Sequence, residues 1–175
     1  MKVYKNMSGL EFVVSEKLAN RQVKVTFLAT GSVVQMHNGN LTAGKVKDPF
    51  VPSRCGIGFL GYFDKSVLFH KQAYQLWSNM IKRCYDKNDA KGYYGTGVSV
   101  STSWHCYANF LRDLPTLAGF DCWLTGDHYE LDKDLIGNGK FYSRETCNFI
   151  PRLLNRSLGK GGKRLIDGHW VTTDV

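Results

Sequence analysis

Residues 129–158 read YELDKDLIGNGKFYSRETCNFIPRLLNRSL, and the order of elements in this stretch decides the fold that we expect. Residues 129–132 have the composition of a short strand, and the glycine-rich residues 136–142 have that of a loop. Residues 147–150 read as a second short strand, and the proline after them suits the first turn of a helix over 152–158. The stretch therefore predicts a ββα unit.

The residues before this unit predict two helices. In residues 70–87, four apolar side chains recur at helical spacing and form one stripe: Tyr74, Trp77, Ile81 and Cys84. Such a stripe most often faces the core of its domain, so we interpret it as a buried face. A second helix is expected over Trp104–Leu114, and Pro115 is expected to end it because the residue before a proline avoids the helical region.

The first 45 residues have the pattern of a β-rich module. Apolar and polar side chains alternate over residues 23–27, which is the period of a half-buried strand. Residues 32–37 read as a further strand, and Asn38-Gly39 is a sequence typical of a hairpin turn. Short strands joined by tight turns predict a small, barrel-like sheet of the SH3 type.

Prolines and glycines between residues 49 and 61 form the best candidate for a linker. We therefore expect an α+β protein of two parts. The first is the β-rich module over residues 1–60. The second is a domain over 61–175, which holds the helical segment and the ββα unit at about 129–158.

The composition excludes several classes of protein. Hydrophobic residues make up 43% of the 175 residues, which excludes a wholly disordered chain. No run approaches the roughly eighteen apolar residues of a membrane helix, and the first residues lack the apolar run of a signal peptide. We therefore expect a cytosolic protein without a membrane partner. The cysteines are 5 in number and widely spaced, which disfavours both a disulfide framework and a zinc site built on close cysteine pairs.

Charge is unevenly distributed along the chain. The net charge of +8 favours a polyanionic partner, of which nucleic acid is the commonest in the cytosol. Residues 121–155 carry 6 acidic and 4 basic side chains, whereas the segments on either side are net positive. A hydrolase of nucleic acids needs this combination, because basic surface holds phosphates and a few carboxylates hold a divalent metal. Ordinary scatter of charge is the alternative interpretation.

Within this acidic segment, the sequence resembles the HNH (His-Me finger) endonucleases carried by phages. The similar features are DKD at 132–134, a glycine and asparagine loop, YSRETCNFI at 142–150, and Asn155 on the short helix. The resemblance implies a finger in which a strand, a loop, a second strand and a helix together hold the catalytic site.

The residues upstream strengthen this resemblance. LWSNMIKRCYD at 76–86 looks like the helix that precedes the finger in these phage proteins. Trp104 with Phe110 is similar to a segment in which the same family places a tryptophan and a phenylalanine. The resemblance thus covers about residues 70–157, or roughly half of the chain.

The resemblance implies a site for one divalent cation, Mg²⁺ or Mn²⁺, held against the scissile phosphate. Carried over by position, its protein ligands are Asp132 and Asn155. This assignment suits Mg²⁺, which prefers hard oxygen ligands and needs only one or two protein groups. The alternative for Asp132 is a carboxylate that caps a turn, and the alternative for Asn155 is a helix-terminal residue. Asn148 could contact the metal or DNA, with a strand-edge hydrogen bond as its simpler interpretation.

One position departs from the family pattern. The residue after the metal-binding position is usually the histidine that activates water, and here it is Lys133. A protonated lysine is a poor base, so Lys133 would instead act as a cation, and Asp134 or a metal-bound water would take the proton. His128 is a weak substitute, because four residues along a strand span about 13 Å. Lys133 and Asp134 are therefore the candidate catalytic residues.

Basic residues near these positions are candidates for contacts with DNA phosphates: Lys82, Arg83, Arg144, Arg152, Lys160, Lys163 and Arg164. The sequence thus predicts a phage-type HNH-like DNA endonuclease, homing or nicking, that acts in the cytoplasm of an infected bacterial cell. Two alternatives stay open. One is a catalytically degenerate finger that binds DNA or regulates, and the other is a phage protein that binds a host protein.

Overall fold

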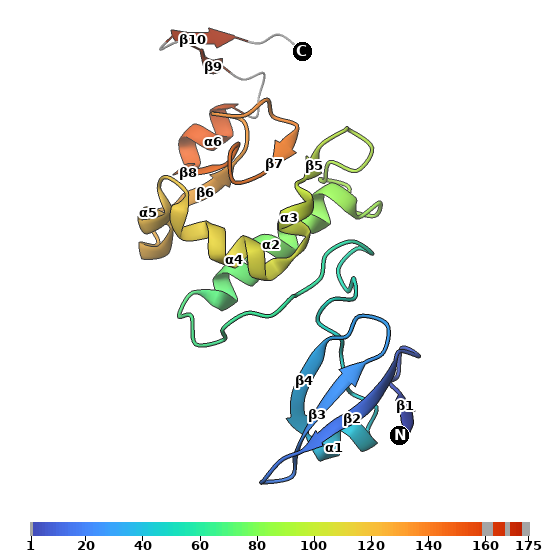
Figure 1. The fold of residues 1–175 in the computed structure, drawn as a ribbon. Helices are drawn as coiled ribbons and strands as arrows, with labels where there is room; N and C mark the ends of the chain where they lie inside the picture. The colour runs from blue at the N-terminus through green and yellow to red at the C-terminus, as the bar shows by residue number, and fades with distance from the viewer. Residues whose placement is uncertain (1, 159–162, 167–168, 173–175) are drawn as a thin grey trace. The chain divides into compact units, whose positions relative to one another are not determined.

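The computed structural model describes residues 2–158, 163–166 and 169–172 (Figure 1). The chain divides into two compact units, Met1–Val51 and Pro52–Val175. Its elements are mixed, with a four-stranded antiparallel sheet in the first unit and mainly helices in the second, so the protein is α+β as the sequence predicts. Within the described ranges, no helix has both the length and the apolar composition needed to cross a membrane.

The first unit is built on one antiparallel sheet. Its strands follow the chain order β1-β2-β3-β4, with these bounds: β1 Val3–Lys5, β2 Glu11–Lys17, β3 Gln22–Phe27 and β4 Val33–His37. The alternation predicted over residues 23–27 is present in β3, where Val23, Val25 and Phe27 are buried. They pack with Phe12 of β2 and Val46 to form a small core.

Two expectations for this unit are not met. The described strands form an open sheet with β1 and β4 at its edges, so the SH3-like barrel is not confirmed. The hairpin predicted at Asn38-Gly39 is wrong, because these residues begin the short helix α1 (Asn38–Thr42). The cause is local: Nδ1 of His37 accepts a hydrogen bond from the Gly39 backbone N–H at 3.2 Å, which caps a helix rather than closing a turn.

The boundary between the units lies after Val51, earlier than the predicted boundary at residue 60. The segment after it is tied to the second unit by backbone hydrogen bonds. Phe59 donates to the carbonyl of His105 at 3.0 Å and accepts from Tyr107 at 2.8 Å. Gly58 is in contact range of the Trp77 ring, where a Cβ would come within 2.9 Å of it.

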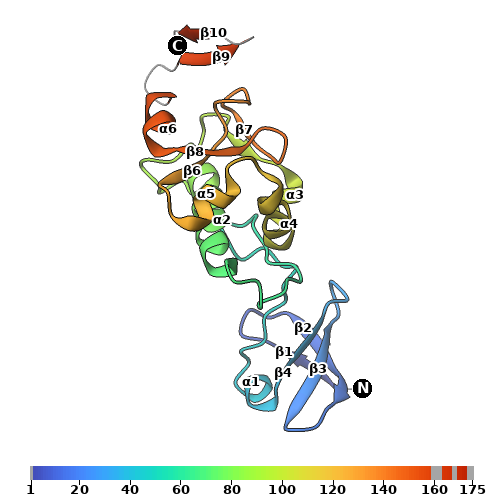
Figure 2. The ribbon, with the colours of Figure 1, turned by 90° about the vertical axis from the view of Figure 1, so that its left-hand side faces the viewer.

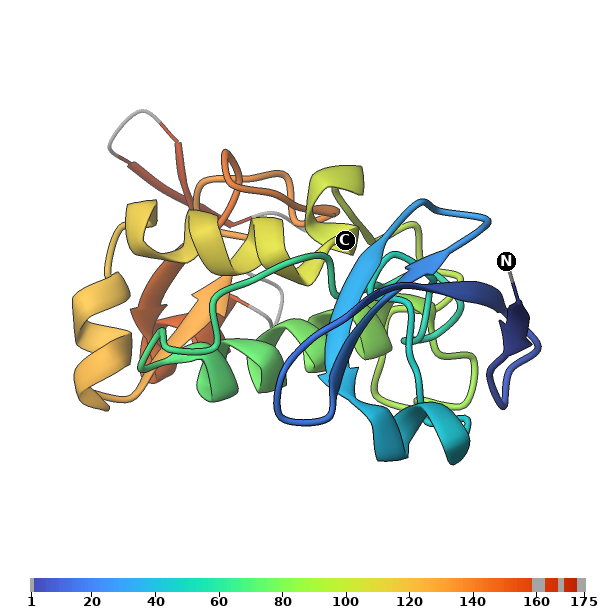
Figure 3. The same ribbon diagram turned by 60° about the horizontal axis from the view of Figure 1, so that its bottom comes forward.

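In the described part of the second unit, helices contribute more residues than strands do. Their bounds are α2 His70–Tyr85, α3 Thr102–His105, α4 Tyr107–Asp113, the 3₁₀ helix η1 Leu114–Thr116 and α5 Phe120–Thr125. Helix α2 confirms the predicted helix and stripe, because Trp77, Ile81 and Cys84 are buried. Tyr74 is 41% exposed, although its ring packs edge-on against Tyr107. Figure 3 shows α2 in green beside α4 in yellow.

The single helix predicted over 104–114 is wrong, because the chain is extended at Cys106 and divides it into α3 and α4. Cys106 forms a parallel bridge with Phe59, and this pairing draws the backbone out of the helical conformation. Pro115 lies inside η1 and does not end the helical segment.

The predicted order of strand, loop, strand and helix is present in residues 129–158, with two corrections. The end of the predicted loop forms a short strand, because Phe141 and Tyr142 pair with residues 99–100, and Pro151 ends the second strand instead of beginning the helix. The elements are β6 Tyr129–Asp132, β7 Phe141–Tyr142, β8 Asn148–Pro151 and α6 Arg152–Leu158. Strands β6 and β8 pair antiparallel, and β7 pairs parallel with β5 (Ser99–Val100). Helix α6 packs against both β6 and β8 (Figure 2). After it, β9 (Lys163–Ile166) and β10 (His169–Thr172) form a separate antiparallel pair.

A close backbone contact fixes β8 against the turn before α5. The backbone N–H of Phe149 donates to the carbonyl of Ala118 at 2.8 Å. Gly119 follows with φ of 77°, and a Cβ at this position would collide with the carbonyl oxygen of Phe149. Glycine is needed here both for its conformation and for the approach of β8. The Trp123 ring then stacks on Phe149 with ring centroids 5.0 Å apart.

Candidate metal and DNA site

Helix α6 directly follows β8 and packs against both strands of the β6–β8 pair. The antiparallel register places Tyr129 opposite Pro151 and Asp132 opposite Asn148. Asp132 and Asn155 line one cavity of about 290 Å³, which we call the site cavity, together with Lys133, Asp134, Glu130 and Arg156. The two residues to which the resemblance assigns a metal are therefore in one place, and the two candidate catalytic residues are with them.

Asp132 is a buried carboxylate, and only one of its two oxygens is hydrogen-bonded. Its side chain is 2% exposed. Oδ2 accepts hydrogen bonds from the backbone N–H groups of Asp134 at 3.0 Å and Leu135 at 2.7 Å. Oδ1 finds no hydrogen-bond partner among the described residues. Asp132 thus caps the turn after β6 through one oxygen, and burial raises the pKa of its carboxyl.

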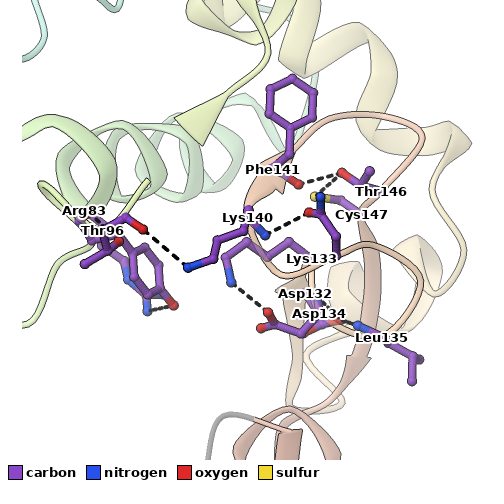
Figure 4. Close-up of polar contacts among 12 residues, drawn as sticks. Arg83, Thr96, Asp132, Lys133, Asp134, Leu135, Lys140, Phe141, Thr146 and Cys147 are labelled. Carbon is purple, nitrogen blue, oxygen red and sulfur yellow. Dashed lines mark hydrogen bonds and ion pairs between the residues drawn. The ribbon is translucent and has the colours of Figure 1, made fainter. Parts of the chain in front are cut away.

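Lys133 turns into the site cavity because β6 ends at Asp132. Its side chain is buried, and Nζ forms an ion pair with Oδ1 of Asp134 at 2.8 Å, as Figure 4 shows. Nζ also lies 4.8 Å from the ring centroid of Tyr93 and 5.5 Å from that of Tyr142. A carboxylate and two ring faces therefore hold the ammonium group in place.

Asn155 is oriented by a glutamate that the sequence analysis missed. Nδ2 of Asn155 donates to Oε2 of Glu130 at 2.8 Å, so the carbonyl oxygen of Asn155 is the atom that can coordinate a cation. Oε1 of Glu130 pairs with Nε of Arg152 at 3.2 Å. The available signal was the spacing, because Glu130 stands two residues before Asp132 and therefore shares its face of the strand.

A second cavity, of about 430 Å³, adjoins the site cavity and shares four lining residues with it: Arg83, Glu130, Leu131 and Asn155. We call it the flanking cavity. Lys82 and Arg83 of α2 line one part of it, and Trp123 and Tyr129 line another. The Arg83 guanidinium also lies 4.6 Å from the ring centroid of Tyr93. The cavities therefore join the candidate metal position to basic side chains of α2.

The remaining predicted DNA-binding residues are placed differently. Arg152 is half exposed and engaged by Glu130, and Arg144 donates from Nε to the Thr116 hydroxyl at 3.1 Å. Lys160 lies outside the described residues, and only the backbone of Lys163 and Arg164 is described. Arg156, which the sequence analysis did not name, lines the site cavity.

His128 precedes β6 and is exposed, with φ of 57°. Its backbone carbonyl accepts a hydrogen bond from the Arg152 N–H at 2.8 Å, which ties the start of α6 to the residue before β6. The backbone of His128 therefore has a structural role, which is to hold the start of α6. The left-handed φ is strained for a residue with a Cβ, and this hydrogen bond helps to offset it.

The donor atoms of the site suit a hard divalent cation. They are a buried carboxylate oxygen without a partner, on Asp132, and the amide carbonyl oxygen of Asn155. In the described ranges, no three His, Cys, Asp or Glu side chains converge as they do in an all-protein metal cage. Mg²⁺ does not need such a cage, because it keeps several waters and is often held by one or two carboxylates with substrate phosphates.

Comparison with known proteins found no matching family model, no matching curated protein and no matching solved structure.

Proposed function

We propose that the protein is a DNA endonuclease of the phage HNH type, homing or nicking, whose finger is the ββα unit of β6, β8 and α6. In this proposal Asp132 and Asn155 hold one Mg²⁺ or Mn²⁺ ion. The observation that carries the proposal is the free Oδ1 of Asp132, on a buried residue that lines a cavity together with Asn155. A buried acceptor without a partner costs about 1–3 kcal/mol, and a bound cation would recover that loss.

The residues of the site cavity divide the chemistry between them. When bound, the cation would stabilise the charge that develops on the scissile phosphate and the leaving oxygen. Asp134 takes the proton from the attacking water, and its ion pair with Lys133 fixes its position. The Lys133 ammonium offsets negative charge beside the phosphate. Glu130 orients Asn155 so that its carbonyl oxygen is free for the metal.

DNA reaches this site along the two adjoining cavities. Lys82 and Arg83 stand on α2 at the flanking cavity, and Arg156 stands on α6 at the site cavity. Basic side chains at these positions would bind backbone phosphates without reading the base sequence. The proposal places the reaction on DNA in the cytoplasm of an infected bacterial cell.

Cleavage of supercoiled plasmid with Mg²⁺ or Mn²⁺ tests the proposal. The wild-type protein should produce nicked or linear DNA, and EDTA should stop the reaction. Asp132→Asn should remove cleavage and leave DNA binding in place. Asp121→Asn is the matched control, because it makes the same change at an exposed carboxylate of α5. Plasmid that stays supercoiled with both metals would contradict the nuclease assignment.

A second candidate function, DNA binding without cleavage, is favoured by Lys133. An ammonium group engaged by Asp134 and two aromatic rings has no lone pair with which to activate water. Lys133→His separates the two candidates. For a nuclease limited by its base, this variant should raise the cleavage rate by about tenfold or more. If the wild type does not cleave and Lys133→His does, the natural chain binds DNA without cutting it.

A further inference from the structure

Two buried oxygen atoms in the described part of the chain find no hydrogen-bond partner: Oδ1 of Asp132 and Oδ1 of Asn148. Both side chains are nearly inaccessible, at 2% and 9% exposure. Nearly all buried polar groups in proteins are hydrogen-bonded, so each exception calls for an explanation. The strand-edge hydrogen bond expected for Asn148 does not explain its carbonyl oxygen.

The two residues are directly opposite each other in the β6–β8 pair. Opposite residues of an antiparallel pair project from the same face, with Cβ atoms about 4.5–5.5 Å apart. Both unpartnered atoms are acceptors, so neither can bond to the other. A cation between them would satisfy both at once.

The oxygen ligands of Asp132 and Asn148 favour a hard divalent cation. Asp132 supplies one negative charge and Asn148 supplies a neutral carbonyl oxygen, and both are hard ligands. A helix residue, Asn155, lines the site cavity together with Asp132 and adds a second carbonyl oxygen. Three protein oxygens leave the remaining positions of an octahedral ion to water and a phosphate, which is the usual arrangement for Mg²⁺.

We propose that Asn148 is a ligand of the same divalent cation as Asp132, so that the metal is held across the β6–β8 pair as well as by α6. This inference rests on the proposed function and adds a residue that the resemblance does not assign. It also explains why an amide stands at the buried start of β8. An apolar side chain there would leave Asp132 as the single ligand from the strands.

Binding of Mn²⁺ to the free protein, followed by the electron paramagnetic resonance signal of unbound Mn²⁺, tests this without DNA and without activity. Asn148→Leu keeps the branched shape of the side chain and replaces both amide heteroatoms by methyl groups, so Mn²⁺ affinity should fall by about tenfold or more. Asn40→Leu, at an exposed asparagine of α1, is the matched control and should bind Mn²⁺ as the wild type does. Circular dichroism shows that each variant is folded.

Asn148→Asp tests the same metal ligand by a second route if the leucine variant does not fold. Two carboxylates directly opposite on a strand pair repel each other, so without metal this variant should melt at a lower temperature than the wild type. Mn²⁺ should restore the loss, giving a larger metal-dependent rise in Tm than in the wild type. Asn40→Asp should show no such gain.

The possible outcomes distinguish the role of Asn148 as a metal ligand from the proposed endonuclease activity. Unchanged Mn²⁺ affinity in Asn148→Leu, or no added metal dependence in Asn148→Asp, overturns the role of Asn148 and leaves the endonuclease proposal standing. An amide that donates from Nδ2 to Asp132 would give this result. Weakened Mn²⁺ binding in Asn148→Leu, with a wild type that cuts no plasmid, supports the ligand and refutes the nuclease. A wild type that binds no Mn²⁺ at millimolar concentration overturns both metal assignments.

Discussion

Helix α2 and the β6–β8 pair both contribute side chains to the interior of the second unit, but they differ in the polar groups that they bury. Helix α2 buries apolar groups, and the indole N–H of Trp77 donates to the carbonyl of Trp104 at 2.7 Å. The β6–β8 pair buries Asp132 and Asn148 and leaves an oxygen of each without a partner. The helix is thus explained by the stability of the fold alone. The two unpartnered oxygens of the strand pair do not add to the stability of the fold, and we propose that a bound cation accounts for them.

The largest effect is expected from the core of α2. Trp77→Ala removes a fully buried ring and leaves the Trp104 carbonyl without its donor, so it should cost about 3–5 kcal/mol of unfolding free energy. Urea denaturation measures this. Trp123→Ala is the comparison, because Trp123 is partly exposed and should cost less. A loss below about 1 kcal/mol for Trp77→Ala would contradict the packing described here.

The strand pair should respond in the opposite direction. In Asp132→Asn, the amide oxygen can keep the two backbone hydrogen bonds, and its NH₂ can donate to Oδ1 of Asn148. Removal of a buried charge and the new bond should stabilise the metal-free protein by about 1–2 kcal/mol. Equilibrium unfolding in EDTA measures the change.

A matched control for this variant is Asp113→Asn. Asp113 is also buried, but its two oxygens accept from Trp104 Nε1 at 2.9 Å and from Arg112 Nε at 3.2 Å. The same substitution should therefore destabilise the protein there. If both variants lost stability alike, the unpartnered oxygens of the strand pair would not lower the unfolding free energy of the wild type.

The pH dependence sharpens the same comparison. Burial raises the pKa of Asp132 above its ordinary value of 3.8, so the folded protein binds this proton more tightly than the unfolded chain. Asp132 therefore lowers stability as the pH rises from about 3.8 through the raised pKa. In EDTA, the Tm advantage of Asp132→Asn over the wild type should be smallest below that window and should grow across it. A difference that is constant from pH 3 to pH 7 would speak against a raised pKa.

The smallest effect is expected at the basic residues of the flanking cavity. Lys82→Ala or Arg83→Ala should weaken DNA binding a few-fold and reduce the slope of log affinity against log salt by about 1. Lys71→Ala is the matched control, because Lys71 is an exposed lysine of the same helix outside the cavities' described lining. Fluorescence anisotropy across a salt series measures both quantities. Equal slopes in all three variants would place the DNA elsewhere.

The sequence predicted the parts of the fold that depend on local pattern. The apolar spacing in α2 identifies Trp77, Ile81 and Cys84 as buried, and the strands of the β6–β8 pair lie close to their predicted bounds. The predictions that failed depend on particular contacts. The His37 side chain turns a hairpin sequence into a helix cap, and Phe59 draws Cys106 out of a helix.

Predictions about the site are limited in the same way, because its geometry depends on contacts between residues that are distant in sequence. Asp132 and Asn155 are found in one cavity, as the resemblance implies, but their roles stay predictions. The setting of Lys133 depends on Tyr93 and Tyr142, which lie far from one another in sequence, so no local pattern could give it. Unpartnered oxygens on Asp132 and Asn148 are likewise a property of tertiary packing.

A crystal of the protein soaked in Mn²⁺, with anomalous diffraction recorded at the manganese edge, tests whether one cation is held by both strands of the β6–β8 pair. We expect one strong anomalous peak within about 2.5 Å of both Asp132 Oδ1 and Asn148 Oδ1, on the side of β6 that faces Asn155. A fully soaked crystal with no peak there, and with a water or the Asn148 amide nitrogen hydrogen-bonded to Asp132 Oδ1, would contradict it.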